Sequence, residues 1–239
     1  MSRTGIVVAM AAEGRCLGRA RARADGLDEL DSGTLVALTG PGAAAAAAGA
    51  RRLREAGAAA LVSFGLAGGL DPALPAGALV LPEETSDGCG CLATDAAWRG
   101  RIRNRLQWAA PDGRPPPAHG GRLLSAARAL TSVHEKAAAF AAGARAVDLE
   151  SHAVAAAAGV PFVAVRVIVD TAADELPAPL ATVVSAGGRV RPGEVAEALL
   201  RRPALLGALL HLAGRYRIAL GTLRAVARAG VDYAPRQGP

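Results

Sequence analysis

The chain has 239 residues, a formal net charge of +6 and 51% hydrophobic residues. This length suits one large α/β domain, and the hydrophobic content excludes an intrinsically disordered chain. Only 3% of the residues are aromatic, so we expect a core of Ala, Val and Leu. The positive charge would suit nucleic acid or an anionic membrane. No basic block interleaved with aromatics occurs in the sequence, which argues against a nucleic-acid partner.

Cysteine usage and the N-terminal residues indicate the compartment. Cys16, Cys89 and Cys91 are odd in number and lack a disulfide-framework spacing, so we expect free thiols. The last two have no His or further Cys at ligand spacing, so we expect no metal site. Residues 1–5 run into an apolar strand without a signal-peptide pattern, and no uncharged apolar run approaches the ~18–20 residues that span a bilayer. These features predict a cytoplasmic protein, and we expect no cofactor.

Strand and helix signals alternate along the chain. Apolar runs predict strands at 5–9, 34–39, 60–64, 78–81, 90–93, 122–124, 145–148 and 161–169. Helical patterns occupy 13–23, 43–56, 98–108, 135–142, 150–158, 192–202 and 203–229, and a Pro- and Gly-rich loop covers 111–119. The alternation predicts a mostly parallel or mixed sheet covered by helices. We expect a single domain over 1–239, with 192–230 as a helical C-terminal extension.

Ligands of such sheets bind at the carboxyl ends of strands, which here follow Ala9, Thr39, Phe64 and Val169. The glycine-rich segment 65–69 could let the backbone approach a ligand closely, or form an ordinary turn. The segment 40–42 precedes a helix and could offer N–H groups to an anion or a water. It lacks the lysine of a P-loop and the spacing of a dinucleotide fingerprint.

Three acids near strand ends are the candidates for chemistry. Asp170 follows the most apolar strand and could be a general acid with a raised pKa, or could cap residues 171–174. Glu150 stands at a strand-to-helix junction and could bind a sugar diol, or belong to a capping box. Glu13 could activate a water as a base, or lie on a helix surface.

These segments together resemble the nucleoside phosphorylase and nucleosidase superfamily. Residues 5–13, 63–70, 147–151 and 165–170 are similar, in family order, to motifs of methylthioadenosine/S-adenosylhomocysteine nucleosidases. The resemblance implies a three-layer α/β/α fold with a central mixed twisted sheet. It also implies that Glu13 activates water, Glu150 binds the sugar hydroxyls and Asp170 protonates the purine. The substrate-binding residues that we expect from it are Gly40, Leu66, Ala67, Gly68, Thr131, Ser132, Leu149 and Glu150.

Departures from the nucleosidase pattern point to one branch. Leu66 replaces a usual Ser, residues 130–133 lack the usual purine-stacking Phe, and residues 178–229 form a longer C-terminal part. Residues 63–70, 148–152 and 199–203 resemble hopanoid-biosynthesis-associated phosphorylases. That resemblance implies adenosylhopane as the substrate, adenine as a product and a homo-oligomer. It leaves open whether phosphate is a co-substrate.

The C-terminal segment has a distinct charge pattern. No Asp or Glu occurs between positions 198 and 231. Apolar residues recur on one helical side at Leu205, Leu209, Leu212, Tyr216, Leu220 and Leu223.

 Arginines are frequent over the same residues, 198–231. Such a basic amphipathic helix can lie on an anionic membrane surface, so 203–229 is a candidate for peripheral membrane contact. The alternative is a helix packed on the core or on a second subunit.

Three functions therefore stay open from the sequence. The first is cleavage of a lipid nucleoside such as adenosylhopane, and the second is a water-using nucleosidase for small soluble nucleosides. The third is a non-catalytic nucleoside-binding protein at the membrane, against which the three retained acids argue. Glu13 favours water over phosphate, because a carboxylate repels a phosphate dianion. Arg166 lies inside a buried strand, where we expect it to pair with an acid rather than bind phosphate.

Overall fold

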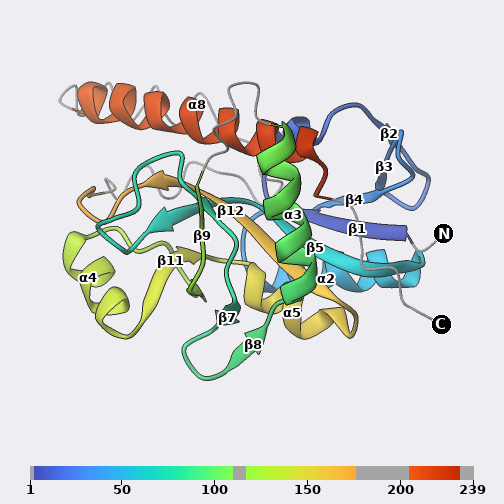
Figure 1. Cartoon of the computed structure of the whole chain (residues 1–239), viewed down its shortest axis with the longest axis horizontal. Coiled ribbons are helices and arrows are strands. Elements are labelled where there is room, and N and C mark those ends of the chain that lie inside the picture. Colours follow the sequence, from blue (N-terminus) through green and yellow to red (C-terminus); the bar gives the residue numbers. More distant parts are fainter. Residues whose placement is uncertain (1–2, 110–116, 176–204, 232–239) are drawn as a thin grey trace.

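Four parallel strands form the centre of the sheet in the computed structural model, which describes residues 3–109, 117–175 and 205–231 (Figure 1). They are β1 (Arg3–Val8), β4 (Leu35–Leu38), β5 (Ala58–Gly69) and β12 (Phe162–Asp170). Their apolar runs are buried on both faces, as parallel strands covered by helices require. β12 pairs with β5 along almost its whole length, from Phe162 opposite Leu61 to Asp170 opposite Gly68.

The remaining strands make the sheet mixed. β10 and β11 are parallel to each other, and β11 joins β5 in the antiparallel sense. The order is β2-β3-β4-β1-β5-β11-β10-β7-β8, with β12 pairing β5 and β6, and β9 pairing β6. The other strands are β2 (Ala20–Ala22), β3 (Asp28–Leu30), β6 (Leu79–Val80), β7 (Glu84–Ser86), β8 (Cys91–Ala93), β9 (Ala118–His119), β10 (Arg122–Ser125) and β11 (Ala144–Asp148).

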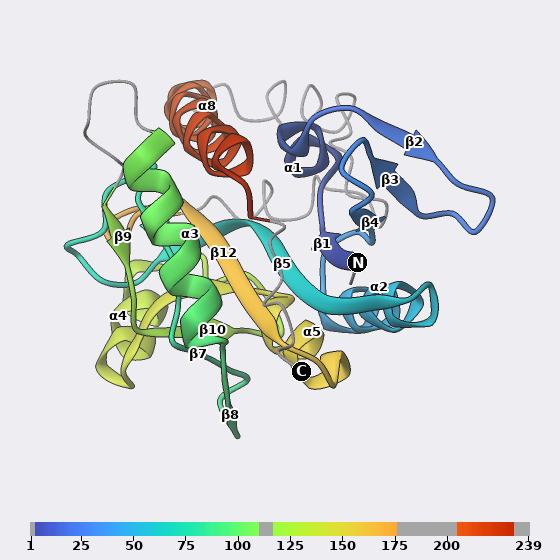
Figure 2. The same cartoon turned by 45° about the vertical axis from the view of Figure 1, so that its right-hand side comes forward.

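Helices cover both faces of this sheet (Figure 2). On one face, α2 (Ala43–Glu55) and α5 (Ser151–Ala158) pack into one apolar cluster, and α4 (Val133–Ala141) lies beside β11. On the other face, α3 (Ala96–Ala109) and α8 (Leu205–Ala229) share a second cluster with the opposite sides of β5 and β12. The expected α/β fold with a central mixed sheet and covering helices is confirmed.

Small residues allow this close packing. α2 buries Ala46, Gly49, Ala50 and Leu53, which recur at helical spacing on its inner side. A Cβ on Gly5 of β1 would stand 2.7 Å from a methyl group of Leu61, so the strand needs glycine there. The expectation of a core built from Ala, Val and Leu holds in both clusters.

Several boundaries differ from the sequence predictions. The helix predicted at 13–23 is wrong: α1 (Ala11–Gly14) and a 3₁₀ turn, η1 (Arg15–Leu17), end at Gly18, whose φ of 107° is open to glycine. Residues 20–22 then form β2, paired with β3, which the sequence analysis missed together with β7 and β9. The helix predicted at 192–202 and most of the loop at 111–119 lie outside the described residues.

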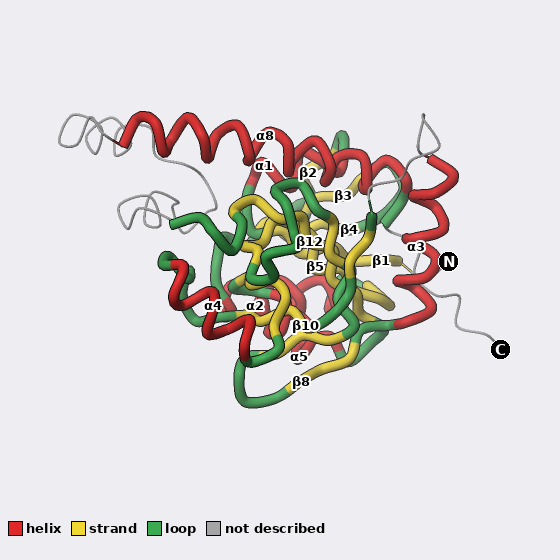
Figure 3. The backbone as a smooth tube through the Cα atoms, turned by 60° about the vertical axis from the view of Figure 1, so that its left-hand side comes forward, coloured by secondary structure: helices red, strands yellow, loops and turns green. Residues whose placement is uncertain are grey.

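The C-terminal helix α8 packs through its second half. Ala219, Leu223 and Val226 are buried, and the indole of Trp98 donates a hydrogen bond to the carbonyl of Val231. The packed-helix alternative is therefore correct for this half. In Figure 3 the N-terminal end of α8 reaches beyond the sheet, and Leu210 there is 65% exposed.

Candidate active site

Glu13 lies in α1, just after β1, and is 3% exposed. The alternative of an acid on a helix surface is therefore wrong. Oε2 accepts the N–H groups of Ala9 and Met10, at 3.1 and 2.8 Å, and Oε1 accepts that of Leu66 at 2.9 Å. Burial raises the pKa of Glu13, and the nearby charge of Arg166 and these hydrogen bonds partly offset the rise. A fixed carboxylate with a raised pKa is suited to take a proton from water.

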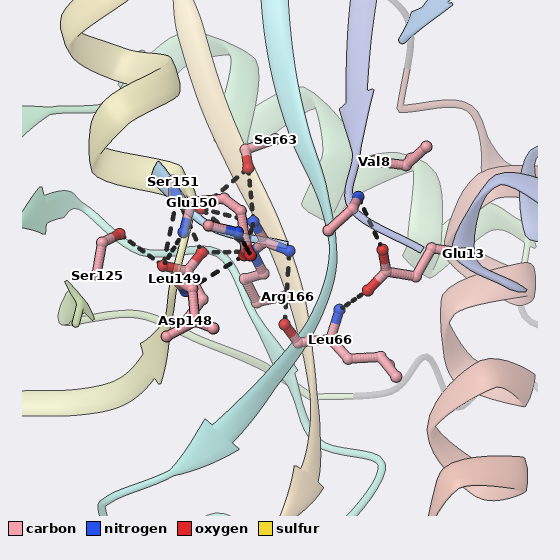
Figure 4. A network of polar contacts seen from close by, with 12 residues as sticks. Val8, Glu13, Ser63, Leu66, Ser125, Asp148, Leu149, Glu150, Ser151 and Arg166 are labelled. Atoms are coloured by element: carbon pink, nitrogen blue, oxygen red, sulfur yellow. Dashed lines mark hydrogen bonds and ion pairs between the residues drawn. The ribbon is translucent and has the colours of Figure 1, made fainter. Parts of the chain in front are cut away.

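Arg166 of β12 is a buried cation that several acids share (Figure 4). Its Nε lies 2.8 Å from Oδ2 of Asp148, and its Nη2 lies 3.8 Å from Oε2 of Glu150. It also donates to the hydroxyls of Ser63, at 2.6 Å, and Ser151, at 3.0 Å. The sequence prediction that Arg166 pairs with an acid is confirmed.

Glu150 precedes α5 and is 6% exposed. Its side chain makes no capping bond to α5, so the capping-box alternative is wrong. Instead, Oε1 accepts the N–H of Gly42 at 2.9 Å and Oε2 accepts that of Leu149 at 3.2 Å. Burial, and then the charge of Asp148, raises the pKa of Glu150 to about 7. The anion that the 40–42 segment meets is thus a carboxylate of the protein itself.

Asp170 ends β12 and is 5% exposed. Its Oδ2 lies 2.5 Å from Nζ of Lys136, a residue of α4. The alternative in which Asp170 caps 171–174 is wrong, because the N–H of Thr171 donates to Asp174 instead. Burial raises the pKa of Asp170, and the ammonium of Lys136 opposes that rise. The raised pKa is what the sequence analysis expected of a general acid.

The glycine-rich segment 65–69 belongs to β5 and lies against the acids of the site. Residues 65–69 continue β5 as regular strand, so the turn alternative is wrong and the close backbone approach is correct. A Cβ on Gly65 would stand 2.5 Å from Oε1 of Glu13 and closer still to the guanidinium of Arg166. A Cβ on Gly68 would stand 3.2 Å from Oδ2 of Asp170. Side chains at these glycines would occupy the space that the acid groups use.

The spacing of the acids follows from this strand. Glu13 and Glu150 are linked through Arg166 near Gly65, and the charge of each acts on Arg166. Asp170 lies beside Gly68, three residues further on, or about 10 Å along a strand. A purine nucleoside, with its sugar and two fused rings, can reach from one position to the other. The structure therefore brings the three acids to neighbouring strand ends.

The predicted substrate-binding residues divide into two groups. Leu66, Ala67 and Gly68 lie on β5 beside Glu13 and Asp170, and Leu149 donates its N–H to Glu150. Gly40 follows β4, two residues before Gly42, whose N–H binds Glu150. Thr131 and Ser132 cap α4 instead: both N–H groups donate to Glu135, and the hydroxyl of Ser132 accepts the N–H of Glu135. Their contact with a substrate stays a prediction.

Sequence reasoning missed two charged residues of the site. Asp148 accepts bonds from Arg166 and from the hydroxyl of Ser125, and Lys136 binds Asp170. Lys136 is the single lysine in a chain whose other strongly basic residues are all arginine, and this rarity could have marked it as a candidate site residue. Nothing in its helical surroundings shows which acid it meets, because that contact joins residues 34 positions apart.

An apolar pocket of about 300 Å³ lies beside α4. It is lined by Leu70, Pro72, Val133, Ala137, Phe140, Thr171, Ala172 and Ala173, and none of the three acids lines it. Within the described ranges no group of three or more His, Cys, Asp or Glu side chains could hold a metal ion. Over the same part of the chain, no helix has the length and apolar character needed to span a bilayer.

The fold and the site define an α/β protein with a mixed sheet and buried acids at its strand ends. The chain belongs to the phosphorylase superfamily, whose family model matches residues 30–201. No curated protein sequence matches the chain.

Solved nucleosidase structures share the fold. A 5'-methylthioadenosine/S-adenosylhomocysteine nucleosidase from Neisseria meningitidis, in complex with methylthio-immucillin-A, has a TM-score of 0.69 at 19% identity, over 96% of this chain and 98% of that one. The nucleosidase of the same description from Campylobacter jejuni has a TM-score of 0.69 at 13% identity, over 97% of each chain. Futalosine hydrolase of Helicobacter pylori has a TM-score of 0.65 at 15% identity, over 95% and 97%. At these identities the similarity establishes the common fold.

Proposed function

We propose that this protein cleaves the N-glycosidic bond of a purine nucleoside and releases the base. The observation that carries the proposal is the placement of three buried acids, Glu13, Glu150 and Asp170, along residues 65–68 of one strand. A superfamily that includes phosphorylases, and a fold shared with nucleosidases, supports it.

Each acid has a role in this reaction. Asp170 gives a proton to the imidazole ring of the purine, so that the base leaves as a neutral molecule. Glu150 accepts hydrogen bonds from the ribose hydroxyls and stabilises the positive charge that develops on the sugar. Glu13 takes a proton from the water that attacks the opposite face of the anomeric carbon. These are the roles that the resemblance implied.

We propose water rather than phosphate as the attacking group. The guanidinium of Arg166 is already matched by Asp148, with Glu150 and Glu13 close by. A phosphate dianion placed there would meet three carboxylates around one cation, an unfavourable balance in a buried site. A water needs no added positive charge.

Purified protein offered adenosylhopane, adenosine and methylthioadenosine, each with and without phosphate, tests both statements. We expect adenine release that does not depend on phosphate. The free base is measured by chromatography. Turnover that requires phosphate, with a ribose 1-phosphate product, would replace hydrolysis by phosphorolysis. Binding of a nucleoside without release of adenine from any of the three would favour the non-catalytic alternative and end the proposal.

For the substrate, we propose a lipid-linked purine nucleoside such as adenosylhopane. The backbone N–H of Leu66 binds Glu13, and Leu66 brings an apolar side chain to a position where the soluble-nucleoside enzymes resembled by this chain carry a Ser. Residues Tyr216 and Leu220 of α8 pack near Glu13 and Cys16, so this helix borders the site. Leu210 and Ile218 are exposed on α8, as are Arg217, Arg224 and Arg228. Exposed apolar and basic side chains together favour an anionic membrane surface.

The double variant Leu210→Glu, Arg217→Glu tests the membrane contact. We expect it to lose binding to vesicles that contain anionic lipid and to turn over vesicle-bound adenosylhopane more slowly, with adenosine turnover unchanged. Arg51→Glu on α2 is the matched control, because Arg51 is also exposed but lies across the sheet. An equal loss with adenosine, or unchanged vesicle binding, would refute the membrane contact.

A further inference from the structure

Lys136 is a buried lysine on a helix that is otherwise half-exposed. It is the only lysine of the chain, and its side chain is 0% exposed. Removing an ammonium group from water costs several kcal/mol unless the charge is paired and its protons are bonded. Such a placement needs partners that restore this free energy.

All three partners of Lys136 belong to the end of β12 and the segment after it. Nζ lies 2.5 Å from Oδ2 of Asp170, 2.8 Å from the carbonyl oxygen of Thr171 and 2.9 Å from that of Asp174. An ammonium has three protons to donate, so these contacts use its full capacity. Lys136 therefore ties α4 to the carboxyl end of β12.

The other charges near Asp170 are already engaged. Asp174 pairs with Arg215 of α8 and accepts the N–H and the hydroxyl of Thr171. Arg215 acts on Asp170 only as a more distant positive charge. On the other side, β5 presents the backbone of Gly68, which carries no side chain. Lys136 is thus the one described side chain that binds the Asp170 carboxylate directly.

The geometry fixes how Asp170 is presented. Oδ2 is bonded to Lys136, and Oδ1 is the oxygen that Lys136 does not bond. Both oxygens lie against Gly68, at 3.2 and 3.4 Å from the position of a Cβ there. A carboxyl group held by one oxygen can direct the other to a substrate without loss of orientation.

We propose that Lys136 is a positioning residue for the proposed reaction: it orients Asp170 at the strand end and stabilises the carboxylate that remains once the proton has moved to the purine. In that step the proton leaves Oδ1 and forms an N–H bond on the imidazole ring of the base. The glycosidic bond breaks, and its electron pair passes to the purine. The new carboxylate of Asp170 then pairs with the Lys136 ammonium, and water adds to the sugar with loss of its proton to Glu13. This inference rests on the proposed function.

The pH dependence of kcat/KM tests it, with adenosine in wild type, Lys136→Met and Lys136→Arg. Without the cation, burial acts on Asp170 unopposed, so its pKa rises and the alkaline limb of the profile moves upward, by about 1–3 pH units. We expect kcat of Lys136→Met to fall while KM changes little, and Lys136→Arg to keep the wild-type midpoint because it keeps the charge. If the midpoint of the alkaline limb of kcat/KM stays at the wild-type pH in Lys136→Met, the proposal is overturned.

A second substrate separates this role from a structural one. A nitrophenyl riboside has a leaving group that departs without a proton, so Lys136→Met should cleave it at close to the wild-type rate. Equal losses on adenosine and on the riboside would show a merely structural lysine. If the Met variant does not fold, Lys136→Gln takes its place, since its amide offers two N–H donors to the same partners and removes the charge. A wild-type protein that cleaves no nucleoside would end the proposed function instead, an outcome distinct from an active enzyme with an unmoved midpoint.

Discussion

Asp170→Asn is expected to lose about 10²–10⁴-fold in the rate of adenine release, the usual contribution of general acid catalysis. The amide has almost the same shape as the carboxyl group but has no acidic proton to give to the purine. Asp170 is 5% exposed, so bulk water has little access to replace it as the acid. The measurement is kcat with adenosine and adenosylhopane under saturating substrate.

Asp71→Asn is the matched control for that variant. Asp71 is also a mostly buried aspartate in an ion pair, with Arg145, and it lies outside the group of three acids. The control should keep its activity although it also loses the charge of an aspartate that is paired with a cation. If Asp170→Asn released adenine at a near-normal rate, Asp170 would lose its role as the acid.

Arg166→Met should lower the free energy of unfolding by about 3–5 kcal/mol, the usual result of removing one partner from a buried ion pair. Arg166 is 2% exposed, and its removal leaves Asp148 and Glu150 in the interior without their cation. Urea unfolding at pH 7 measures the loss. Arg145→Met is the control, because the Arg145 side chain is 36% exposed and such a pair contributes roughly 0–1 kcal/mol.

The loss of unfolding free energy in Arg166→Met should depend on pH. The charge of Arg166 lowers the pKa of Glu150, so without the arginine that pKa rises further above its value in the unfolded chain. The folded variant then holds more protons than the unfolded chain, so its stability falls as the pH rises. The difference from wild type should therefore be larger at pH 8 than at pH 5. A deficit that is equal at both pH values would mean that lost packing, and not the unpaired carboxylates, causes it.

Local patterns predicted the central strands and the acids well, since the information lies within a few residues. The apolar runs at 5–9, 34–39 and 161–169 became β1, β4 and β12, and the three acids lie at strand ends as expected. The helix at 13–23 failed because Gly18 ends it and because β2 forms only by pairing with β3. The glycine run at 65–69 was ambiguous, since its extended form depends on β12 and β11 beside it.

The sequence by itself determined the alternation of strands and helices, the small-residue core and the identity of Glu13, Glu150 and Asp170 as chemical candidates. These follow from hydrophobic periodicity and from where a charged residue interrupts an apolar run. Only the tertiary structure decided that Arg166 joins Asp148 and Glu150, and that Lys136 binds Asp170. A buried charge is stable only beside its partner, and the partner is chosen by which helices and strands pack together, over separations that no local pattern records.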